Sequence, residues 1–176
     1  MDANVKNKIE IVSGDITTQD TDAIVNAANN SLLGGSGVDG AIHRAAGKEL
    51  LTECITLNGC ETGDAKITKG YNLKSRYIIH TVGPVWHGGN HNEANLLKCC
   101  YKKSLELAVL NNIFSISFPA ISTGVYRFPV NHATKIAITK AMHFLSANES
   151  FGKIRFVCFD ENTYRIYLET TKELLG

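Results

Sequence analysis

The sequence lacks a long apolar run, the pattern of a signal peptide and an excess of charge of either sign. None of its apolar stretches approaches the ~20 residues that a membrane-spanning helix needs, so we expect no membrane partner. The first ten residues, MDANVKNKIE, have no apolar segment of the signal-peptide kind, which favours a cytoplasmic protein. The net charge of +1 gives no electrostatic footprint for nucleic acid, so neither RNA nor DNA is an expected partner.

Cysteine is sparse: there are five, an odd number, and no C-x-x-C pair. A disulfide framework is therefore not expected. Four of the cysteines lie in apolar or helical stretches, where cysteine usually behaves as a small core residue. These four are Cys54, Cys99, Cys100 and Cys158. Cys60 lies in a turn-like stretch and has no assigned role.

The sequence offers no convincing metal site. His87 and His91 have the i,i+4 spacing that would align two metal ligands on a helix. Gly88 and Gly89 lie between them and argue against a helix, so we interpret the segment as a loop with two unrelated histidines. We therefore expect neither a metal nor a cofactor.

The length of 176 residues, with 44% hydrophobic and 20% charged residues, suits one globular domain, residues 1–176. Apolar, β-prone segments alternate with amphipathic ones, without repeats or linkers. This pattern predicts an α/β fold with a mostly parallel sheet covered on both faces. The expected strands are 8–12, 20–27, 63–70, 76–82, 113–118 and 153–159. The expected helices are 40–57, broken at Gly47, then 92–110, 131–145 with Asn131 as N-cap, and 161–174.

Polar or glycine-rich loops follow most of the expected strands. In sheets of this kind, ligands bind beyond the carboxyl ends of the strands, so we expect the loops to form one cleft. The loops lie at Asp15, at 26–39, at 83–92 and at 120–129, and Phe159-Asp160 ends the last strand.

Residues 26–47, NAANNSLLGGSGVDGAIHRAAG, combine a strand end, a glycine-rich loop and a helix start. Bare glycine backbone and the N–H groups of a helix N-terminus suit an oxyanion or a phosphate. Residues 35–40 also match the dinucleotide fingerprint G-x-G-x-x-G, but that fingerprint follows a strand directly and here a polar stretch intervenes. Asp39 among the glycines would repel a pyrophosphate, so an oxidoreductase that uses this motif is not favoured.

Two roles are open for Asp39 when the loop is considered alone. Aspartate is a common helix N-cap, which usually contributes ~1 kcal/mol, and a helix is expected from about Gly40. The alternative is a catalytic or ribose-binding carboxylate beside a phosphate site. From the loop alone the cap is the preferred interpretation, and the rest of the chain changes that preference.

A second loop, FPAISTGVYRFP at 118–129, follows an expected strand and precedes an expected helix. Ser122, Thr123 and Gly124 offer hydroxyl and N–H groups in succession. Tyr126 and Phe128 are placed to wall the site against a sugar, although an ordinary turn with core aromatics is the alternative. Each hydrogen bond to a charged group contributes ~1.5–3 kcal/mol, so the two loops together predict a diphosphate held from both sides.

Several motifs occur in order along nearly the whole chain and are far more specific together than the lone G-x-G-x-x-G. They are GDIT at 14–17, NAAN at 26–29, GVDGAIHRAAG at 37–47, GDAKIT at 63–68, IHTVGPVW at 79–86, FPAISTGVYRFP at 118–129 and FVCFDENTYRIY at 156–167. With these motifs the chain resembles the macro domain family, and within it the bacterial O-acetyl-ADP-ribose deacetylases of the MacroD-like class.

The resemblance implies a three-layer α/β/α sandwich, built around a mostly parallel mixed sheet, that binds ADP-ribose. Asp15 would accept from the adenine amino group, the Ile16 backbone would contact the ring, and Phe159 would lie near its face. Residues 37–39 and 122–126 would hold the diphosphate and the distal ribose. The ligand contacts implied in this way are Asp15, Ile16, Asn26, Gly37, Val38, His43, Ser122, Thr123, Gly124, Val125, Tyr126 and Phe159.

The resemblance makes Asn29 and Asp39 the catalytic residues. Asn29 would hydrogen-bond the distal ribose, and Asp39 would orient or deprotonate a water. His43, one helical turn past Asp39, would either fix its carboxylate or be a satisfied core histidine, and both roles remain open. The family often has glycine where this chain has Ser36 and Arg127. Because of Arg127, the resemblance predicts the residues at the rim of the cleft less well than those at its floor.

The resemblance implies hydrolysis of an ester on the distal ribose of ADP-ribose, with no metal. O-acetyl-ADP-ribose would give ADP-ribose and acetate, and proteins mono-ADP-ribosylated at Asp or Glu are a further candidate substrate class. The alternative is a non-catalytic module that binds ADP-ribose. The presence of both Asn29 and Asp39 favours the enzyme.

Overall fold

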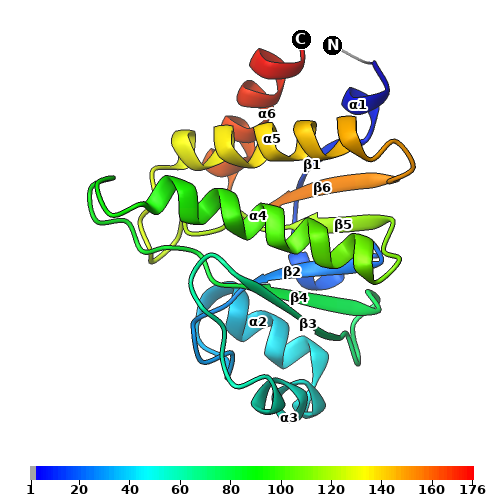
Figure 1. The fold of residues 1–176 in the computed structure, drawn as a ribbon, viewed down its shortest axis with the longest axis vertical. Helices are drawn as coiled ribbons and strands as arrows, with labels where there is room; N and C mark the ends of the chain where they lie inside the picture. Colours follow the sequence, from blue (N-terminus) through cyan, green and yellow to red (C-terminus); the bar gives the residue numbers. More distant parts are fainter. Residues whose placement is uncertain (1–2) are drawn as a thin grey trace.

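The computed structural model describes residues 3–176 and contains a six-stranded sheet (Figure 1). The strands are β1 Ile9–Ser13, β2 Ala23–Ala27, β3 Ala65–Lys69, β4 Tyr77–Thr81, β5 Ser115–Phe118 and β6 Lys153–Cys158. Their order in the sheet is β1-β6-β5-β2-β4-β3, and neighbouring strands are parallel except for the antiparallel pair β3 and β4. The predicted mostly parallel mixed sheet is confirmed.

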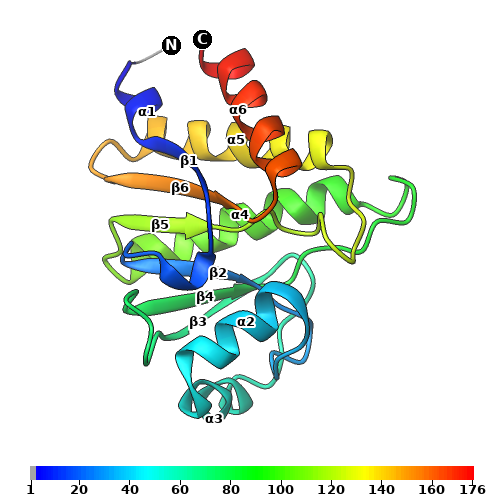
Figure 2. The same ribbon diagram turned by 180° about the vertical axis from the view of Figure 1, so that it is seen from behind.

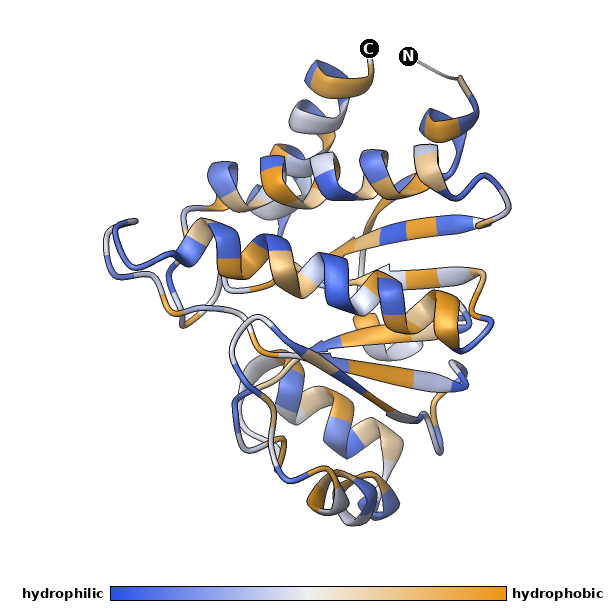
Figure 3. Ribbon diagram, in the orientation of Figure 1, coloured by the Kyte–Doolittle hydropathy of each residue, from blue (hydrophilic) through white to orange (hydrophobic). Residues whose placement is uncertain are grey.

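Helices cover both faces of this sheet (Figures 1 and 2). They are α1 Ala3–Asn7, α2 Gly37–Ala46, α3 Lys48–Thr56, α4 Glu93–Leu110, α5 Val130–Ala147 and α6 Glu161–Leu175, with a 3-10 turn, η1, at Ile16–Thr18. One hydrophobic cluster joins the sheet to α4, α5 and α6, and a second joins its other face to η1, α2 and α3. Hydrophobic and hydrophilic residues alternate along β6, whereas the outermost part of the loop before α4 is hydrophilic (Figure 3). The predicted three-layer α/β/α sandwich is confirmed.

Strand β2 shows how the sequence builds these two layers. Successive side chains of a strand point to opposite faces of the sheet. Ile24 packs in the cluster of α2 and α3, whereas Ala23 and Val25 pack in the cluster of α4 and α5. A parallel strand that is buried on both faces therefore needs a continuous apolar sequence. Asn26 breaks that rule, because it is polar and 0% exposed.

The expected helix 40–57 is two helices, α2 and α3, that meet at Gly47, so the predicted break is confirmed. Gly47 has a φ of 92°, a region that favours glycine. The expectation that Asn131 caps the next long helix is wrong, because Pro129 occupies the N-cap position of α5. Proline suits a helix start because its φ is nearly helical and it has no N–H to satisfy.

The cysteines are all free, and most of them are buried as expected. Cys54, Cys100 and Cys158 lie in the core, and so does Cys60, which had no role assigned from the sequence. The expectation that Cys99 is a core residue is wrong, because it is exposed on α4. Neighbouring residues of a helix point about 100° apart, so only one of the adjacent pair Cys99 and Cys100 can face the sheet.

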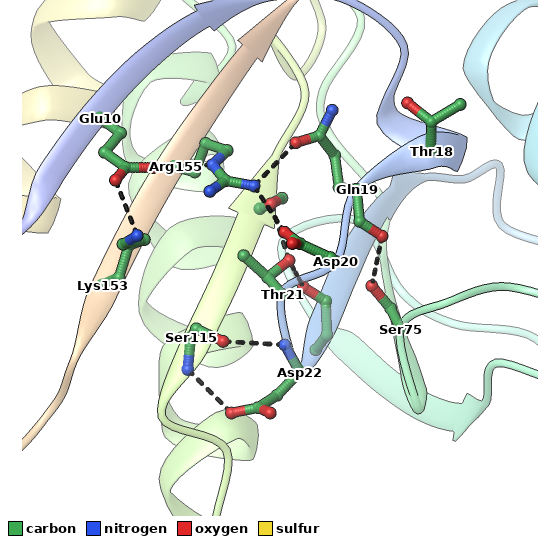
Figure 4. A network of polar contacts seen from close by, with 12 residues as sticks. Glu10, Thr18, Gln19, Asp20, Thr21, Asp22, Ser75, Ser115, Lys153 and Arg155 are labelled. Atoms are coloured by element: carbon green, nitrogen blue, oxygen red, sulfur yellow. Dashed lines mark hydrogen bonds and ion pairs between the residues drawn. The ribbon is translucent and has the colours of Figure 1, made fainter.

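A polar network ties the connection between η1 and β2 to the strands beside it (Figure 4). The guanidinium of Arg155 on β6 donates to Glu10 Oε2 at 2.8 Å. It also donates to Gln19 Oε1 at 3.0 Å and to Asp20 Oδ1 at 3.1 Å. Asp22 Oδ2 accepts from the backbone N–H groups of residues 114 and 115 at 2.9 and 3.1 Å. These contacts hold η1 and its connection against the sheet.

The loop before α4 is fastened by one buried carboxylate, that of Glu93, which is 1% exposed. It accepts from the backbone N–H groups of His87, Gly89 and His91, at 2.9, 2.8 and 2.5 Å. Burial disfavours the charge and raises the pKa of Glu93, but these N–H groups together outweigh burial and lower the pKa to about 2. The expected placement of His87 and His91 on a loop is confirmed, and three backbone N–H groups of that loop donate to the Glu93 carboxylate.

We expect Glu93→Gln to lower the melting temperature at pH 7, because an amide oxygen carries less negative charge and the NH2 group would face backbone donors. The folded-state pKa is lowered, so the stabilisation is present above the unfolded-state pKa of about 4.3 and is lost as the pH falls toward about 2. Thermal unfolding should therefore show a difference at pH 7 that narrows on acidification. Glu61→Gln, the same change at an exposed glutamate, is the control. Equal melting temperatures of Glu93→Gln and wild type at pH 7 would contradict this expectation.

Candidate functional site

The loops that follow the parallel strands meet at one edge of the sheet (Figure 2). The N–H of Gly14, after β1, donates to the carbonyl of Cys158 at the end of β6 at 3.0 Å. The N–H of Trp86, after β4, donates to the carbonyl of Tyr126, after β5, at 2.8 Å. These bonds join the loops in two neighbouring pairs, and the single cleft expected from the sequence stays a prediction.

Asp15 and Phe159 form one end of this edge. Asp15 is exposed, and its Oδ1 accepts from the N–H and the hydroxyl of Thr17 at 2.8 and 2.7 Å, which caps η1. Both bonds use Oδ1, so Oδ2 is available to an outside donor. Phe159 is 85% exposed at the end of β6, whereas the Ile16 side chain is buried in the cluster of α2 and α3. A free acceptor beside an exposed ring suits a flat base with an amino group.

Helix α2 begins earlier than the sequence suggested, and this removes Asp39 from the cap. The N–H of Gly40 donates to the carbonyl of Ser36 at 3.3 Å, so the first helical residue is Gly37 and Ser36 is the N-cap. Asp39 is the third helical residue and is 4% exposed. The cap interpretation of Asp39 is therefore wrong. Val38 packs against the cluster of α2 and α3.

The carboxylate of Asp39 lies against Gly35 and Asn29. A Cβ on Gly35 would lie 3.0 Å from Asp39 Oδ2 and 3.3 Å from Asn29 Nδ2, so a larger residue there would press on both side chains. Asn29 is held in place, because its Nδ2 donates to the carbonyl of Gly34 at 3.0 Å and its Oδ1 accepts from Ser31 Oγ at 2.7 Å. Asp39 Oδ2 is buried and has no hydrogen-bond partner within residues 3–176. The structure thus brings together the two predicted catalytic residues, whose roles stay predictions.

His43 lies one turn along α2 from Asp39, with its Nε2 3.5 Å from Asp39 Oδ1. That nitrogen is buried and makes no hydrogen bond in the described part of the chain, so His43 is not a satisfied core histidine. The alternative, in which His43 fixes the Asp39 carboxylate, stays a prediction, because the two groups approach without a hydrogen bond. A hollow of about 340 Å³ beside α2 and α3 is lined by His43 and Gly35, among others.

Asn26 hydrogen-bonds the Asp39 carboxylate, and His80 lies next to Asn26. Asn26 Nδ2 donates to Asp39 Oδ1 at 2.9 Å and lies 3.0 Å from His80 Nδ1. Because Asn26 is fully buried, its predicted contact with a ligand stays a prediction, and its observed partners belong to the protein. Sequence reasoning missed His80. The signal was available, since a histidine in the apolar strand YIIHT is an exception of the same kind as Asn26.

The second loop is built around a close approach between Gly83 and Ser122. A Cβ on Gly83 would lie 2.1 Å from Ser122 Oγ. Ser122 has a φ of 65° and is buried, and its hydroxyl has no partner within the described residues. Thr123 Oγ1 donates to the carbonyl of Ala120 at 2.9 Å, and Gly124 is exposed. The Ser122 hydroxyl is thus buried and the Thr123 hydroxyl donates within the loop, so the predicted contacts of this row with a diphosphate stay predictions.

Aromatic and apolar side chains of this loop divide into two groups. Val125 is 81% exposed and Tyr126 is half-buried, so both lie where a ligand can reach them. The expectation that Phe128 walls the site is wrong, because Phe128 is 1% exposed. It packs on Trp86 and His132, with ring centroids 4.7 and 5.3 Å away, and is a core residue.

A larger hollow lies elsewhere, and no metal cluster adjoins the edge. The hollow, of about 400 Å³, lies between α4 and α5 and includes Lys98, Lys135 and Lys140 but no predicted site residue.

Residues 3–176 contain no group of three or more His, Cys, Asp or Glu side chains arranged to hold a metal ion. None of the helices described is long and apolar enough to span a membrane.

Comparison with known proteins identifies the fold. The family model described as Macro domain matches residues 25–137. A macro domain-containing protein of Mesorhizobium japonicum is 58% identical over 168 residues, which are 96% of this chain and 96% of that protein. The O-acetyl-ADP-ribose deacetylase of Citrobacter rodentium is 52% identical over 167 residues, 93% of this chain and 94% of that protein. The Trypanosoma brucei macrodomain in complex with ADP-ribose has a TM-score of 0.90 at 44% identity, covering 98% of this chain and 71% of that one. The resemblance inferred from the motifs is confirmed, and the chain belongs to the macro domain family.

Proposed function

We propose that this chain binds ADP-ribose at the loop edge of the sheet and hydrolyses an ester on its distal ribose. The observation that carries the proposal is the buried carboxylate of Asp39, whose Oδ2 is unpartnered within residues 3–176 while Gly35 and Asn29 lie against it. A buried anion without full hydrogen bonding is costly, and such a group is best explained by a task. Two relatives support the ligand class: one is solved in complex with ADP-ribose, and another is named an O-acetyl-ADP-ribose deacetylase.

The ligand would lie across the ends of β6, β5 and β2. Asp15 Oδ2 would accept from the adenine amino group at one end. A Cβ on Gly37 or Gly124 would meet nothing within 4 Å, so the backbone there leaves room for a diphosphate close to the N-terminus of α2. The distal ribose would then reach Asn29 and Asp39 at the other end.

Ester hydrolysis adds water to the acyl carbon and breaks the bond between that carbon and the ribose oxygen. The ribose oxygen leaves as a hydroxyl, and acetate is released with one proton. Asp39 would orient the water or take its proton, and a phosphate oxygen of the substrate is the alternative base. Positioning and a base account for this chemistry without a metal. The same bond joins ADP-ribose to a protein Asp or Glu, so mono-ADP-ribosylated proteins are a second proposed substrate class.

The test is incubation of the purified protein with O-acetyl-ADP-ribose in the presence of a chelator, followed by chromatography of the products. We expect ADP-ribose and acetate at equal rates, with no loss of activity from the chelator. Binding of ADP-ribose without any cleavage would instead identify a module that only binds the nucleotide. Activity that disappears with chelator and returns with a divalent ion would contradict the metal-free chemistry.

Asp15→Asn should weaken the binding of ADP-ribose about tenfold or more, because a hydrogen bond to a charged group contributes ~1.5–3 kcal/mol. Asparagine keeps an oxygen for the bonds from Thr17 that cap η1, but it turns an NH2 group toward the adenine amino group. Calorimetry with ADP-ribose and with ribose 5-phosphate separates the two ends of the ligand. Equal losses for both ligands would remove Asp15 from the adenine site.

A further inference from the structure

A row of buried polar side chains runs beneath Asp39 across three neighbouring strands. Asn26 on β2 donates from Nδ2 to Asp39 Oδ1 at 2.9 Å, and the same nitrogen lies 3.0 Å from His80 Nδ1 on β4. His80 Nε2 lies 2.9 Å from Thr68 Oγ1 on β3, and that hydroxyl donates to the carbonyl of Lys69 at 3.1 Å. Asn26 and His80 are 0% exposed and Thr68 is 2% exposed. Hydrogen bonds therefore connect β3 to the carboxylate on α2.

One arrangement of hydrogens is compatible with every contact of this row, and it leaves Asn26 Oδ1 buried without a partner among residues 3–176. The hydroxyl of Thr68 gives its proton to the Lys69 carbonyl, so its oxygen must accept from His80 Nε2–H. His80 Nδ1 is then the acceptor for one N–H of Asn26, and the other N–H goes to Asp39. Rotation of the Asn26 amide by half a turn would place its oxygen against the carboxylate, where two acceptors repel.

His80 stays neutral, as this arrangement requires. Burial disfavours the charged ring, and the neighbouring His43 adds to that effect, so the pKa of His80 is lowered to about 3. The other groups near the ring are uncharged: Asn26, Thr68 and the Cys54 thiol, whose sulfur lies 3.9 Å from Nε2. Nothing in this row therefore changes its protonation near neutral pH.

We propose that His80 and Thr68 are positioning residues, which fix the tautomer of the imidazole and, through it, the amide orientation of Asn26 that holds Asp39. Both lie within the sheet, and His80 and Asn26 separate Thr68 from the carboxylate, so Thr68 cannot touch a ligand. The Asn26 bond occupies Asp39 Oδ1 and leaves Oδ2 as the oxygen free to act. The catalytic consequence rests on the proposed function, whereas the tautomer and the amide orientation do not.

Loss of the Thr68 hydroxyl removes the acceptor that selects Nε2–H. The Nε2 proton would then lose its acceptor, whereas a proton on Nδ1 would face the Asn26 donor at 3.0 Å, so either tautomer leaves one N–H group unpaired unless the Asn26 amide rotates. The Asn26 amide would rotate or lose a bond, and Asp39 would no longer be held in one direction. A small misplacement of a catalytic group typically lowers turnover by about ten- to a hundredfold without a matching loss of ligand binding.

The decisive variant is Thr68→Val, which keeps the shape and removes the hydroxyl, with Thr68→Ser as the conservative partner. Thr21→Val is the matched control, because Thr21 is 4% exposed and also makes two side-chain bonds, to Ala23 O at 2.9 Å and Ser117 Oγ at 2.8 Å. We expect Thr68→Val to lower kcat for O-acetyl-ADP-ribose about tenfold or more at an unchanged Kd for ADP-ribose. Thr68→Ser should restore kcat, and Thr21→Val should lower stability without lowering kcat. A Thr68→Val protein with wild-type kcat would overturn the proposal.

Nitrogen-15 NMR of the imidazole tests the same proposal without any turnover. The wild type should show His80 with a protonated Nε2 and a bare Nδ1, and Thr68→Val should change both this signal and that of the Asn26 amide. A proton on His80 Nδ1 of the wild type would overturn the proposal. An Asn26 amide signal that is the same in Thr68→Val as in the wild type would overturn it too. If the protein binds ADP-ribose but hydrolyses nothing, the proposed function fails and these two NMR results alone decide the positioning role.

Discussion

Asp39→Asn should lower kcat for O-acetyl-ADP-ribose by about a hundredfold or more, because a positioned carboxylate base contributes about 10²–10⁴-fold. Asparagine keeps the size of the side chain, and its oxygen can still accept the bond that Asn26 makes at 2.9 Å. ADP-ribose should bind at least as tightly as before, since a negative charge near the diphosphate is removed. Helix capping is not disturbed, because Ser36 and not Asp39 holds the N-cap position.

The experiment measures kcat on the ester and Kd for ADP-ribose for the same protein, with a melting curve as the check on folding. Asp64→Asn is the control for the change of charge, because Asp64 is exposed and asparagine can keep its bond to the N–H of Ala65. A folded Asp39→Asn protein with wild-type kcat would strip Asp39 of its catalytic role. Catalysis would then not explain why Asp39 Oδ2 is buried without a hydrogen-bond partner among residues 3–176.

Gly83→Ala should damage both the fold and the binding of ADP-ribose. The new Cβ would lie 2.1 Å from Ser122 Oγ and 2.8 Å from Ile121 Cγ2, so the loop after β5 has to move. Overpacking of this kind costs about 1–3 kcal/mol, and each kcal/mol lowers the melting temperature of a chain this size by about 2–4 °C. Displacement of one hydrogen bond to the diphosphate would weaken binding about tenfold or more.

Gly124→Ala is the matched variant for this experiment. A Cβ there would meet nothing within 4 Å and Gly124 does not have a positive φ, so the melting temperature should not change. Binding should nevertheless weaken, because the methyl group would enter the space proposed for the diphosphate. Calorimetry and thermal unfolding on both variants separate the two effects. Wild-type stability and affinity in Gly83→Ala would contradict the tight packing of Ser122 against Gly83. Wild-type affinity in Gly124→Ala would show that the diphosphate does not bind next to Gly124.

The alternation of strands and helices could be read from the sequence because hydrophobic periodicity is a local property. It predicted the order of the elements, whereas the break in the first long helix was predicted from Gly47 itself. Helix α1 was not predicted, because its five residues carry too little periodicity. Motifs, rather than periodicity, gave the candidate site residues around Asp39.

What could not be predicted depends on contacts between distant parts of the chain. The row from Asn26 through His80 to Thr68 exists because β2, β4 and β3 are neighbours in the sheet, and strand pairing is not encoded in any one segment. Phe128 was expected to wall the site because its own loop contains polar residues and glycine. Its burial against Trp86, which lies on another loop, could not be predicted from that segment. Helix α2 starts at Gly37 with Ser36 as N-cap, although aspartate is the more typical cap and the sequence places Asp39 just before the expected helix.

The most direct test of the proposed hydrolysis is turnover of O-acetyl-ADP-ribose by the wild-type protein in water enriched in oxygen-18, with mass spectrometry of both products. Attack of water on the acyl carbon predicts unlabelled ADP-ribose and acetate that carries one oxygen-18 atom. Label in the ADP-ribose would place the bond cleavage on the sugar and contradict the proposed role of Asp39. If the protein binds ADP-ribose but leaves O-acetyl-ADP-ribose intact, the proposed hydrolysis is contradicted.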